Sequence, residues 1–158
     1  MGEPKPWFKI LPNACTAEIE CPNEDGSKDV VKIGLLSGED ATLATMWANK
    51  CSELDLARQA EKDPAKYAAL CQSLLGANAT YYAIRLGGGV RLWSFKGADG
   101  KPLPVPQSIA GIMRDTGTTP KASAEDVREL TDAITLITKI PVKYKYRIDQ
   151  GITDLGEA

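Results

Sequence analysis

The sequence contains no histidine, which limits the chemistry that its side chains can carry out. Histidine acid–base catalysis, Ser-His-Asp and Cys-His nucleophile systems and imidazole metal sites are therefore excluded. Carboxylates and lysines remain as alternatives. Glu18 and Glu20 have the spacing of paired acids on one strand face, but a solvated strand surface accounts for the same spacing. We predict no catalytic residues and no enzyme.

Gly87-Gly88-Gly89 is a second place where chemistry could occur, because consecutive backbone amides can cradle a phosphate. A Walker loop, however, ends in Gly-Lys-Ser/Thr, whereas Gly100-Lys101 is followed by Pro102. The simpler interpretation is a loose hairpin turn. A small ligand-binding domain or enzyme that uses lysines and carboxylates around the glycines stays as an alternative, and it predicts a concave pocket with converging polar groups.

Two groups of residues resemble metal sites, and both are incomplete. The segment 23–29 has oxygen-bearing side chains at alternating positions, as in a calcium loop, but Gly34 stands where the bidentate glutamate belongs. The four cysteines include no Cys-x-x-Cys pair. They are Cys15, Cys21, Cys51 and Cys71. We predict no metal site and no cofactor, and we expect reduced thiols that are mostly buried.

The composition is that of one globular domain. The chain has 158 residues, of which 43% are hydrophobic and 25% are charged. Its net charge of −2 lacks the basic excess of a nucleic-acid-binding protein, so we predict no nucleic-acid partner. No apolar run is long enough to span a membrane, and residues 1–6 do not resemble a secretory signal. We expect a cytoplasmic protein with no membrane partner.

Hydrophobic periodicity predicts a hairpin followed by a pair of helices. Residues 16–21 and 31–35 alternate as two strands, with the turn at Asp25-Gly26. A helix starts at the capping sequence 37–40, and a second helix starts at Asp63-Pro64 and stops at Gly76. The apolar stripes of these helices are Leu43, Trp47, Cys51 and Leu54, and then Tyr67, Leu70, Cys71, Leu74 and Leu75.

The rest of the chain is predicted to contain a second hairpin, two helices and a strand. Strands at 81–86 and 90–95 flank the triple glycine, and a short helix runs from about residue 106 to 113. A surface connection at 115–121 leads to a helix that starts at Ser123 and ends at Pro141. The apolar face of that helix is Val127, Leu130, Ile134 and Ile137. Residues 142–148 alternate large apolar and basic side chains, which predicts a strand.

These elements predict a single α+β domain over residues 1–158, in which helices pack on one face of an antiparallel sheet. Residues 1–6 and 149–158 are predicted to be flexible tails. Four aromatic residues are the candidates for protein binding. They are Trp93, Phe95, Tyr144 and Tyr146. The strand that holds Trp93 and Phe95 has apolar groups on both faces, so it is either buried on both sides or open to a partner on one.

The region 80–140 contains a series of short motifs. A tryptophan-bearing segment, Val90-Arg-Leu-Trp93, leads through Asp99-Gly-Lys-Pro-Leu-Pro104 into a short helix at 108–112. A further helix contains a Leu-x-x-Ala-Ile pattern at Leu130, Ala133 and Ile134. This layout resembles that of small tail-assembly proteins of tailed bacteriophages. The N-terminal hairpin, the helix that contains Trp47 and the segment 142–148 have no counterpart in this pattern.

The resemblance implies a non-enzymatic phage protein that acts as a tail-assembly chaperone and keeps tail-tube or tape-measure subunits soluble. Its location would be the cytoplasm of the infected host cell. The 142–148 strand would then serve as an edge to which a partner strand adds. A virion structural subunit of the tail, neck or capsid is the alternative within the binding class, and a homo-oligomer remains open.

Overall fold

The computed structural model describes residues 5–11, 15–113 and 124–157. The chain forms β1 (Phe8–Leu11), β2 (Thr16–Pro22), β3 (Lys28–Gly34), α1 (Gly38–Ala60), α2 (Pro64–Gly89), β4 (Val90–Trp93), α4 (Ala124–Thr138) and α5 (Val142–Glu157). A short helical turn lies at 110–113. The predicted surface connection at 115–121 and the helix start at Ser123 fall outside the described residues. The predicted α+β class is confirmed.

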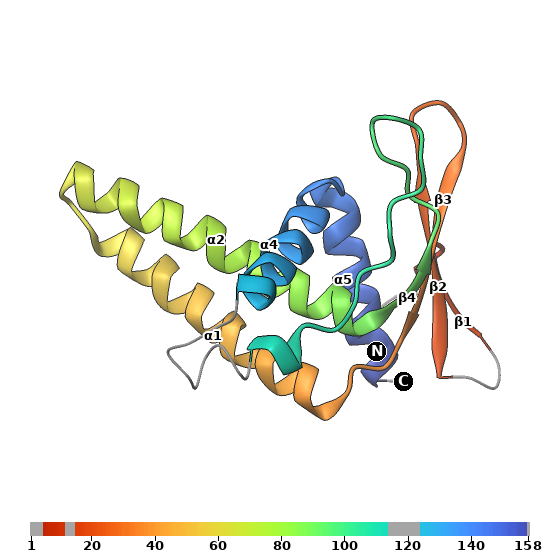
Figure 1. The fold of residues 1–158 in the computed structure, drawn as a ribbon, viewed down its shortest axis with the longest axis horizontal. Helices are drawn as coiled ribbons and strands as arrows, with labels where there is room; N and C mark the ends of the chain where they lie inside the picture. Colours follow the sequence, from red (N-terminus) through yellow and green to blue (C-terminus); the bar gives the residue numbers. More distant parts are fainter. Residues whose placement is uncertain (1–4, 12–14, 114–123, 158) are drawn as a thin grey trace.

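The strands form one antiparallel sheet in the order β1-β2-β3-β4, and the helices lie on one side of it (Figure 1). The predicted first hairpin is confirmed: β2 pairs with β3, and Gly26 at the turn has a φ of +88°. The alternation along β2 buries Ala17, Ile19 and Cys21, while Glu18 and Glu20 lie on the opposite face. Helix α5 packs on the buried face of β2 and β3.

The prediction of a strand at 142–148 is wrong, because these residues begin helix α5. The alternation ends after Ile148, and the buried residues of the whole segment follow a helical period. They are Tyr144, Ile148, Gly151, Ile152 and Leu155. The flexible tail predicted at 149–158 is also wrong as far as residue 157, and Asp154 forms an ion pair with Lys5 at 2.5 Å.

The prediction of a second hairpin is wrong as well. Helix α2 does not stop at Gly76 but continues through 81–86 and the three glycines to Gly89. Only the following segment forms a strand, β4, which pairs with β3. The triple glycine is therefore the last turn of a helix and not the tip of a hairpin. This turn is buried, and each glycine faces a different part of the molecule.

The three glycines, here called the glycine turn (Gly87–Gly89), allow a close approach of three segments. A Cβ atom on Gly87 would overlap the backbone carbonyl of Gln107. A Cβ on Gly88 would lie 2.6 Å from Oδ2 of Asp40 in α1, and one on Gly89 would overlap Ile152 of α5. A larger residue at Gly87 would have to push the Gln107 backbone away, whereas one at Gly88 or Gly89 would have to displace the side chain of Asp40 or Ile152. The intrinsic helix penalty of glycine is thus offset by packing that no other residue permits.

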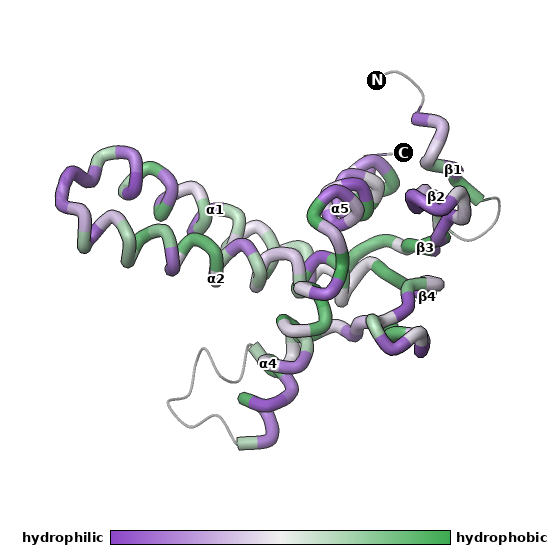
Figure 2. The backbone as a smooth tube through the Cα atoms, turned by 90° about the horizontal axis from the view of Figure 1, so that it is seen from above, coloured by the Kyte–Doolittle hydropathy of each residue, from purple (hydrophilic) through white to green (hydrophobic). Residues whose placement is uncertain are grey.

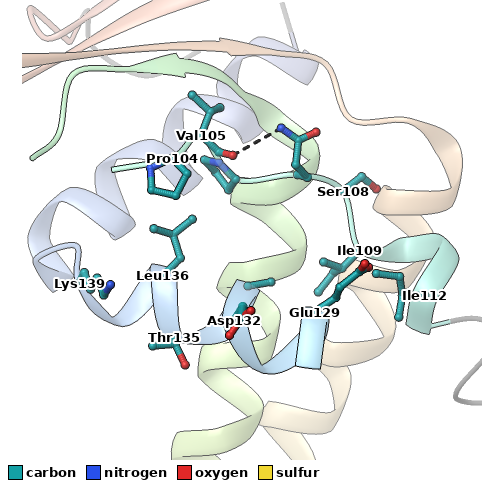
Figure 3. A pocket seen from close by; sticks show the side chains of 13 residues that line it. Pro104, Val105, Ser108, Ile109, Ile112, Glu129, Asp132, Thr135, Leu136 and Lys139 are labelled. Carbon is teal, nitrogen blue, oxygen red and sulfur yellow. Dashed lines mark hydrogen bonds between the residues drawn. The ribbon is translucent and has the colours of Figure 1, made fainter. Parts of the chain in front are cut away.

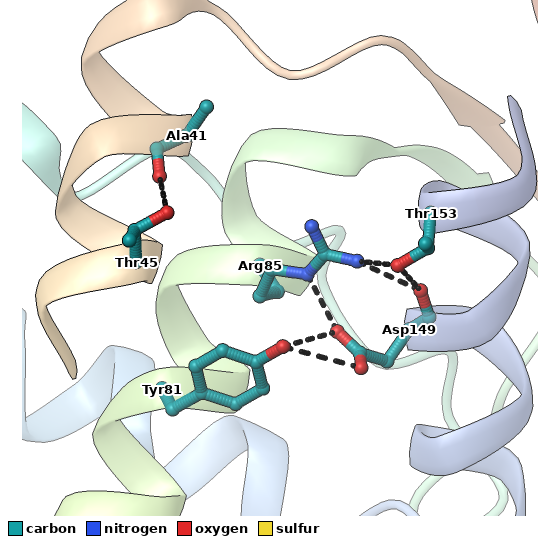
Figure 4. A network of polar contacts seen from close by, with 6 residues as sticks. All are labelled: Ala41, Thr45, Tyr81, Arg85, Asp149 and Thr153. Atoms are coloured by element: carbon teal, nitrogen blue, oxygen red, sulfur yellow. Dashed lines mark hydrogen bonds and ion pairs between the residues drawn. The ribbon is translucent and has the colours of Figure 1, made fainter. Parts of the chain in front are cut away.

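Helices α2 and α5 are also joined by a polar network (Figure 4). The Arg85 Nε atom donates to Oδ1 of Asp149 at 2.6 Å, and Nη2 donates to the Asp149 carbonyl oxygen at 2.9 Å and to Oγ1 of Thr153 at 2.5 Å. The Tyr81 hydroxyl donates to the same carboxylate at 3.3 Å. Burial, followed by the nearby Asp149 charge, raises the pKa of Tyr81 to about 12. The network fixes the rotation of α5 against α2.

We expect Gly87→Ala to destabilise the protein by roughly 1–3 kcal/mol, because the added methyl group meets rigid backbone. Gly76→Ala, in the same helix, is the matched control, since nothing lies within 4 Å of its Cβ position. The control should gain roughly 0.5–1 kcal/mol from helix propensity alone. Urea unfolding followed by circular dichroism measures both values. Equal effects of the two substitutions would contradict the close approach.

Asp149→Ala is expected to lower the free energy of unfolding by roughly 3 kcal/mol, because it leaves the largely buried Arg85 guanidinium without its counter-charge. Glu20→Ala removes the exposed pair with Lys28 and should cost at most about 1 kcal/mol. The same unfolding measurement compares the two variants. A loss from Asp149→Ala no larger than that of the control would show that the network contributes little.

Candidate functional site

An open groove with a volume of about 600 Å³ lies between the segment 104–112 and helix α4 (Figure 3). Its walls are mainly apolar, with charged side chains on the α4 side. The residues that line it are Pro104, Val105, Pro106, Gln107, Ser108, Ile109, Ile112, Glu129, Asp132, Ala133, Thr135, Leu136 and Lys139. We call this feature the α4 groove. A concave apolar surface with a few polar groups is the usual form of a binding site.

One wall of the α4 groove is an extended segment with a proline at every second position. Pro104 and Pro106 line the groove, and Pro102 precedes them in a single β-bridge with Lys96. Each proline fixes φ near −65° and has no backbone N–H, so the segment cannot form a helix or a regular strand. Val105 and Ile109 provide apolar surface on this wall. The prolines therefore keep the wall extended before any partner arrives, which reduces the entropy cost of binding.

The extended wall is anchored from behind by residues of the body. The Trp93 indole Nε1 donates to the carbonyl oxygen of Leu103 at 3.1 Å, and the Leu103 amide donates to the Phe95 carbonyl at 2.9 Å. Near the other end, the Ser108 hydroxyl donates to Oδ1 of Asp40 at 2.6 Å. Asp40 is only 4% exposed and belongs to α1. The wall is thus fixed to β4 and to α1.

Helix α4 forms the other wall with a face that the sequence analysis did not identify. The predicted stripe faces the body: Ile137 is buried, Leu130 and Ile134 pack against the core, and Val127 at the helix start is 50% exposed. Leu136 faces the groove instead, and Ala133 both lines the groove and packs against the core. In the sequence, this second face is visible only as two apolar residues beside the main stripe. They indicate a groove only once the proline wall is known to lie opposite them.

The candidate binding residues divide into a buried cluster and one exposed residue. The ring centroids of Trp93 and Phe95 are 5.3 Å apart, and Phe95 stacks on Tyr144 at 6.0 Å. Phe95 and Tyr144 are buried, and Trp93 is half-buried. Tyr146 is 61% exposed on α5, and the edge strand expected there does not exist. Of this cluster, Trp93 and Phe95 hold the proline wall through their hydrogen bonds to Leu103, and Tyr144 packs against Phe95.

A second, polar hollow of about 490 Å³ lies beside the glycine turn, where the alternative of a ligand-binding domain predicted a pocket. Its polar groups are engaged within the protein. The Asp40 carboxylate accepts hydrogen bonds from Ser37 at 2.9 Å and from Ser108 at 2.6 Å. Arg91 donates to the carbonyl oxygens of Gly88 and Leu35 at 2.6 and 2.7 Å. The arrangement joins α1, α2 and β4, and the helical amides of the glycine turn do not form a phosphate cradle.

The remaining candidates for chemistry are dispersed. Within the described ranges, no three His, Cys, Asp or Glu residues are grouped so that they could hold a metal ion. The Asn23 amide donates to Asp29 at 3.0 Å, within the turn that resembles a calcium loop. All four cysteines are free: Cys21 is buried, Cys15 is exposed and the other two are half-buried. Burial raises the pKa of Cys21 to about 11, so this thiol is a poor nucleophile.

Comparison of the chain with protein-family models, curated proteins and solved structures gives no match. Among the described helices, none has the length and apolar character needed to cross a membrane.

Proposed function

We propose that this chain is a non-enzymatic protein-binding factor of the tail-assembly chaperone kind, which holds an apolar segment of a phage tail subunit in the α4 groove. The observation that carries the proposal is the groove itself, with its proline wall held open by Trp93 and Ser108. A preformed apolar groove of this kind suits reversible docking, since this protein loses little conformational entropy when the partner binds.

The region that resembles tail-assembly proteins supplies both walls of the α4 groove. The Trp93 segment and the turn at 99–104 form and anchor the extended wall, and the helix with Leu130, Ala133 and Ile134 forms the other. Because the same residues carry the resemblance and form the groove, we assign the binding function that the resemblance implies to the groove. In this proposal the aromatic residues support the wall. The apolar groups in front of them contact the partner.

The rim of the α4 groove indicates which segment would fit. Glu129 and Asp132 lie on one part of α4 and Lys139 on the last turn after it, so the rim carries acidic and basic groups at separate places. We expect a short apolar segment with a basic residue next to the acidic pair. Such rim contacts guide orientation and association rate, while the apolar contacts provide most of the affinity.

Leu136→Asp is expected to weaken binding to tail-tube and tape-measure subunits at least about tenfold, because it places a charge on the apolar surface of the α4 wall. Val127→Asp is the matched control on the same helix; Val127 is 50% exposed and does not line the groove. Binding to the purified subunits of the phage that encodes the chain would be measured by calorimetry. Wild-type protein that binds neither subunit, or equal losses in both variants, would contradict the proposal.

Mass spectrometry of purified virions separates the chaperone from the alternative of a structural subunit. A chaperone acts before the tail is complete and should be absent from the particles, whereas a tail, neck or capsid subunit should be present in them.

A further inference from the structure

The distal part of the α1–α2 hairpin projects from the body without a core of its own (Figures 1 and 2). All residues from 45 to 76 are described, and each of them is exposed or half-buried. We call this part the arm. Its two helices pack along each other, and the half-buried side of α1 carries Trp47, Cys51 and Leu54. Because helices draw most of their stability from tertiary packing, an arm that buries only one face of each helix is incomplete.

A second stripe of α1 faces solvent. Met46, Asn49, Glu53 and Leu56 follow one another at steps of three, four and three residues, which is the spacing of a coiled-coil seam. All four are exposed, and the two apolar members are exposed by 61% and 66%. This stripe is distinct from the one that packs on α2, so it is free to meet another helix.

The order of residues along this stripe is self-complementary. If a second α1 runs antiparallel, with the two-fold axis level with residue 51, positions whose numbers sum to 102 lie opposite each other. Met46 then meets the partner's Leu56, and Asn49 meets the partner's Glu53, to which its amide can donate a hydrogen bond. By symmetry each contact occurs twice. Two apolar layers therefore enclose two amide–carboxylate layers, and the polar layers fix the register.

The charge and size of the arm also fit a second copy of the chain. The arm carries four basic and four acidic residues, so two arms do not repel each other. They are Lys50, Arg58, Lys62 and Lys66, and Glu53, Asp55, Glu61 and Asp63. Residues 45–60 extend roughly 24 Å, and a helix with its side chains is about 10 Å wide. Because only α1 takes part in the pairing, two such faces bury on the order of 500 Å² in total, an area that fits only a weak, transient contact.

We propose that the exposed stripe of α1 pairs antiparallel with the same stripe of a second copy, which forms a weak, reversible dimer through the arms. The small area predicts dissociation in the micromolar range. The inference does not depend on the α4 groove: Leu136→Asp should leave the dimer intact, and loss of the dimer should leave binding in the groove unchanged.

Analytical ultracentrifugation of the full chain from about 1 to 500 μM tests this proposal, a range that brackets a micromolar dissociation constant. Wild-type protein should change from monomer to dimer, and Leu56→Glu should remain monomeric. Val142→Glu is the matched control, because Val142 is 71% exposed on α5 and lies outside the arm; it should dimerise as the wild type does. Circular dichroism verifies that each variant is folded.

A charge exchange tests the register. Asn49→Glu places two carboxylates opposite each other and should abolish the dimer, whereas Asn49→Glu combined with Glu53→Lys restores opposite charges across the interface and should restore it. Wild-type protein that is monomeric at every concentration would overturn the proposal. So would a dimer that persists in both Leu56→Glu and Asn49→Glu, or a double variant that stays monomeric.

Discussion

The structure depends on the close approach of three segments to the glycine turn at the end of α2. Gly88 gives room to the carboxylate of Asp40 in α1, Gly87 to the backbone at Gln107, and Gly89 to Ile152 in α5. Each contact is possible because a hydrogen atom stands where other residues have a Cβ. The turn therefore brings together a helix hairpin, an extended wall and the helix that covers the sheet, and each of these supplies a different part of the molecule.

This junction also divides the chain into a packed body and an arm. On the body side, the large buried residues of the sheet, α2 and α5 form one continuous core, and the Arg85–Asp149 network joins the two helices. On the arm side, no residue from 45 to 76 is buried, although all of them are described. The two proposed interfaces lie on either side of the division. The α4 groove belongs to the body, and the exposed stripe of α1 belongs to the arm.

The sequence was sufficient for the elements whose period and end signals agree. The hairpin with Asp25-Gly26 at its tip and the helix starts at Ser37 and Asp63 were all predicted correctly. In each case a local hydrogen bond or a positive φ explains the signal: the side chains of Ser37 and Asp63 accept from the amides of Asp40 and Lys66. These effects act within a few residues, so the sequence alone contains them.

Elements that tertiary contacts determine were not predictable in the same way. Residues 142–148 alternate like a strand, but their helix is stabilised by burial of Ile152 and Leu155, beyond the alternating window. The glycine turn was expected at the tip of a hairpin, after a helix that stops at Gly76, and it forms helix because its neighbours require the space. Likewise, Phe95 and Tyr144 were predicted to be protein-binding candidates on strands. Phe95 instead follows β4 into the interior, and Tyr144 is buried on a helix.

Native-state amide hydrogen exchange at low protein concentration, where arms are not paired, tests the division at the glycine turn most directly. If the account is correct, amides of α2 from Ala83 to Gly89 exchange only through global unfolding, while those in the distal part of α1 and α2 exchange through local opening at a much lower free energy. Uniform protection along the whole of α2, or faster exchange at the glycine turn than in the arm, would contradict it.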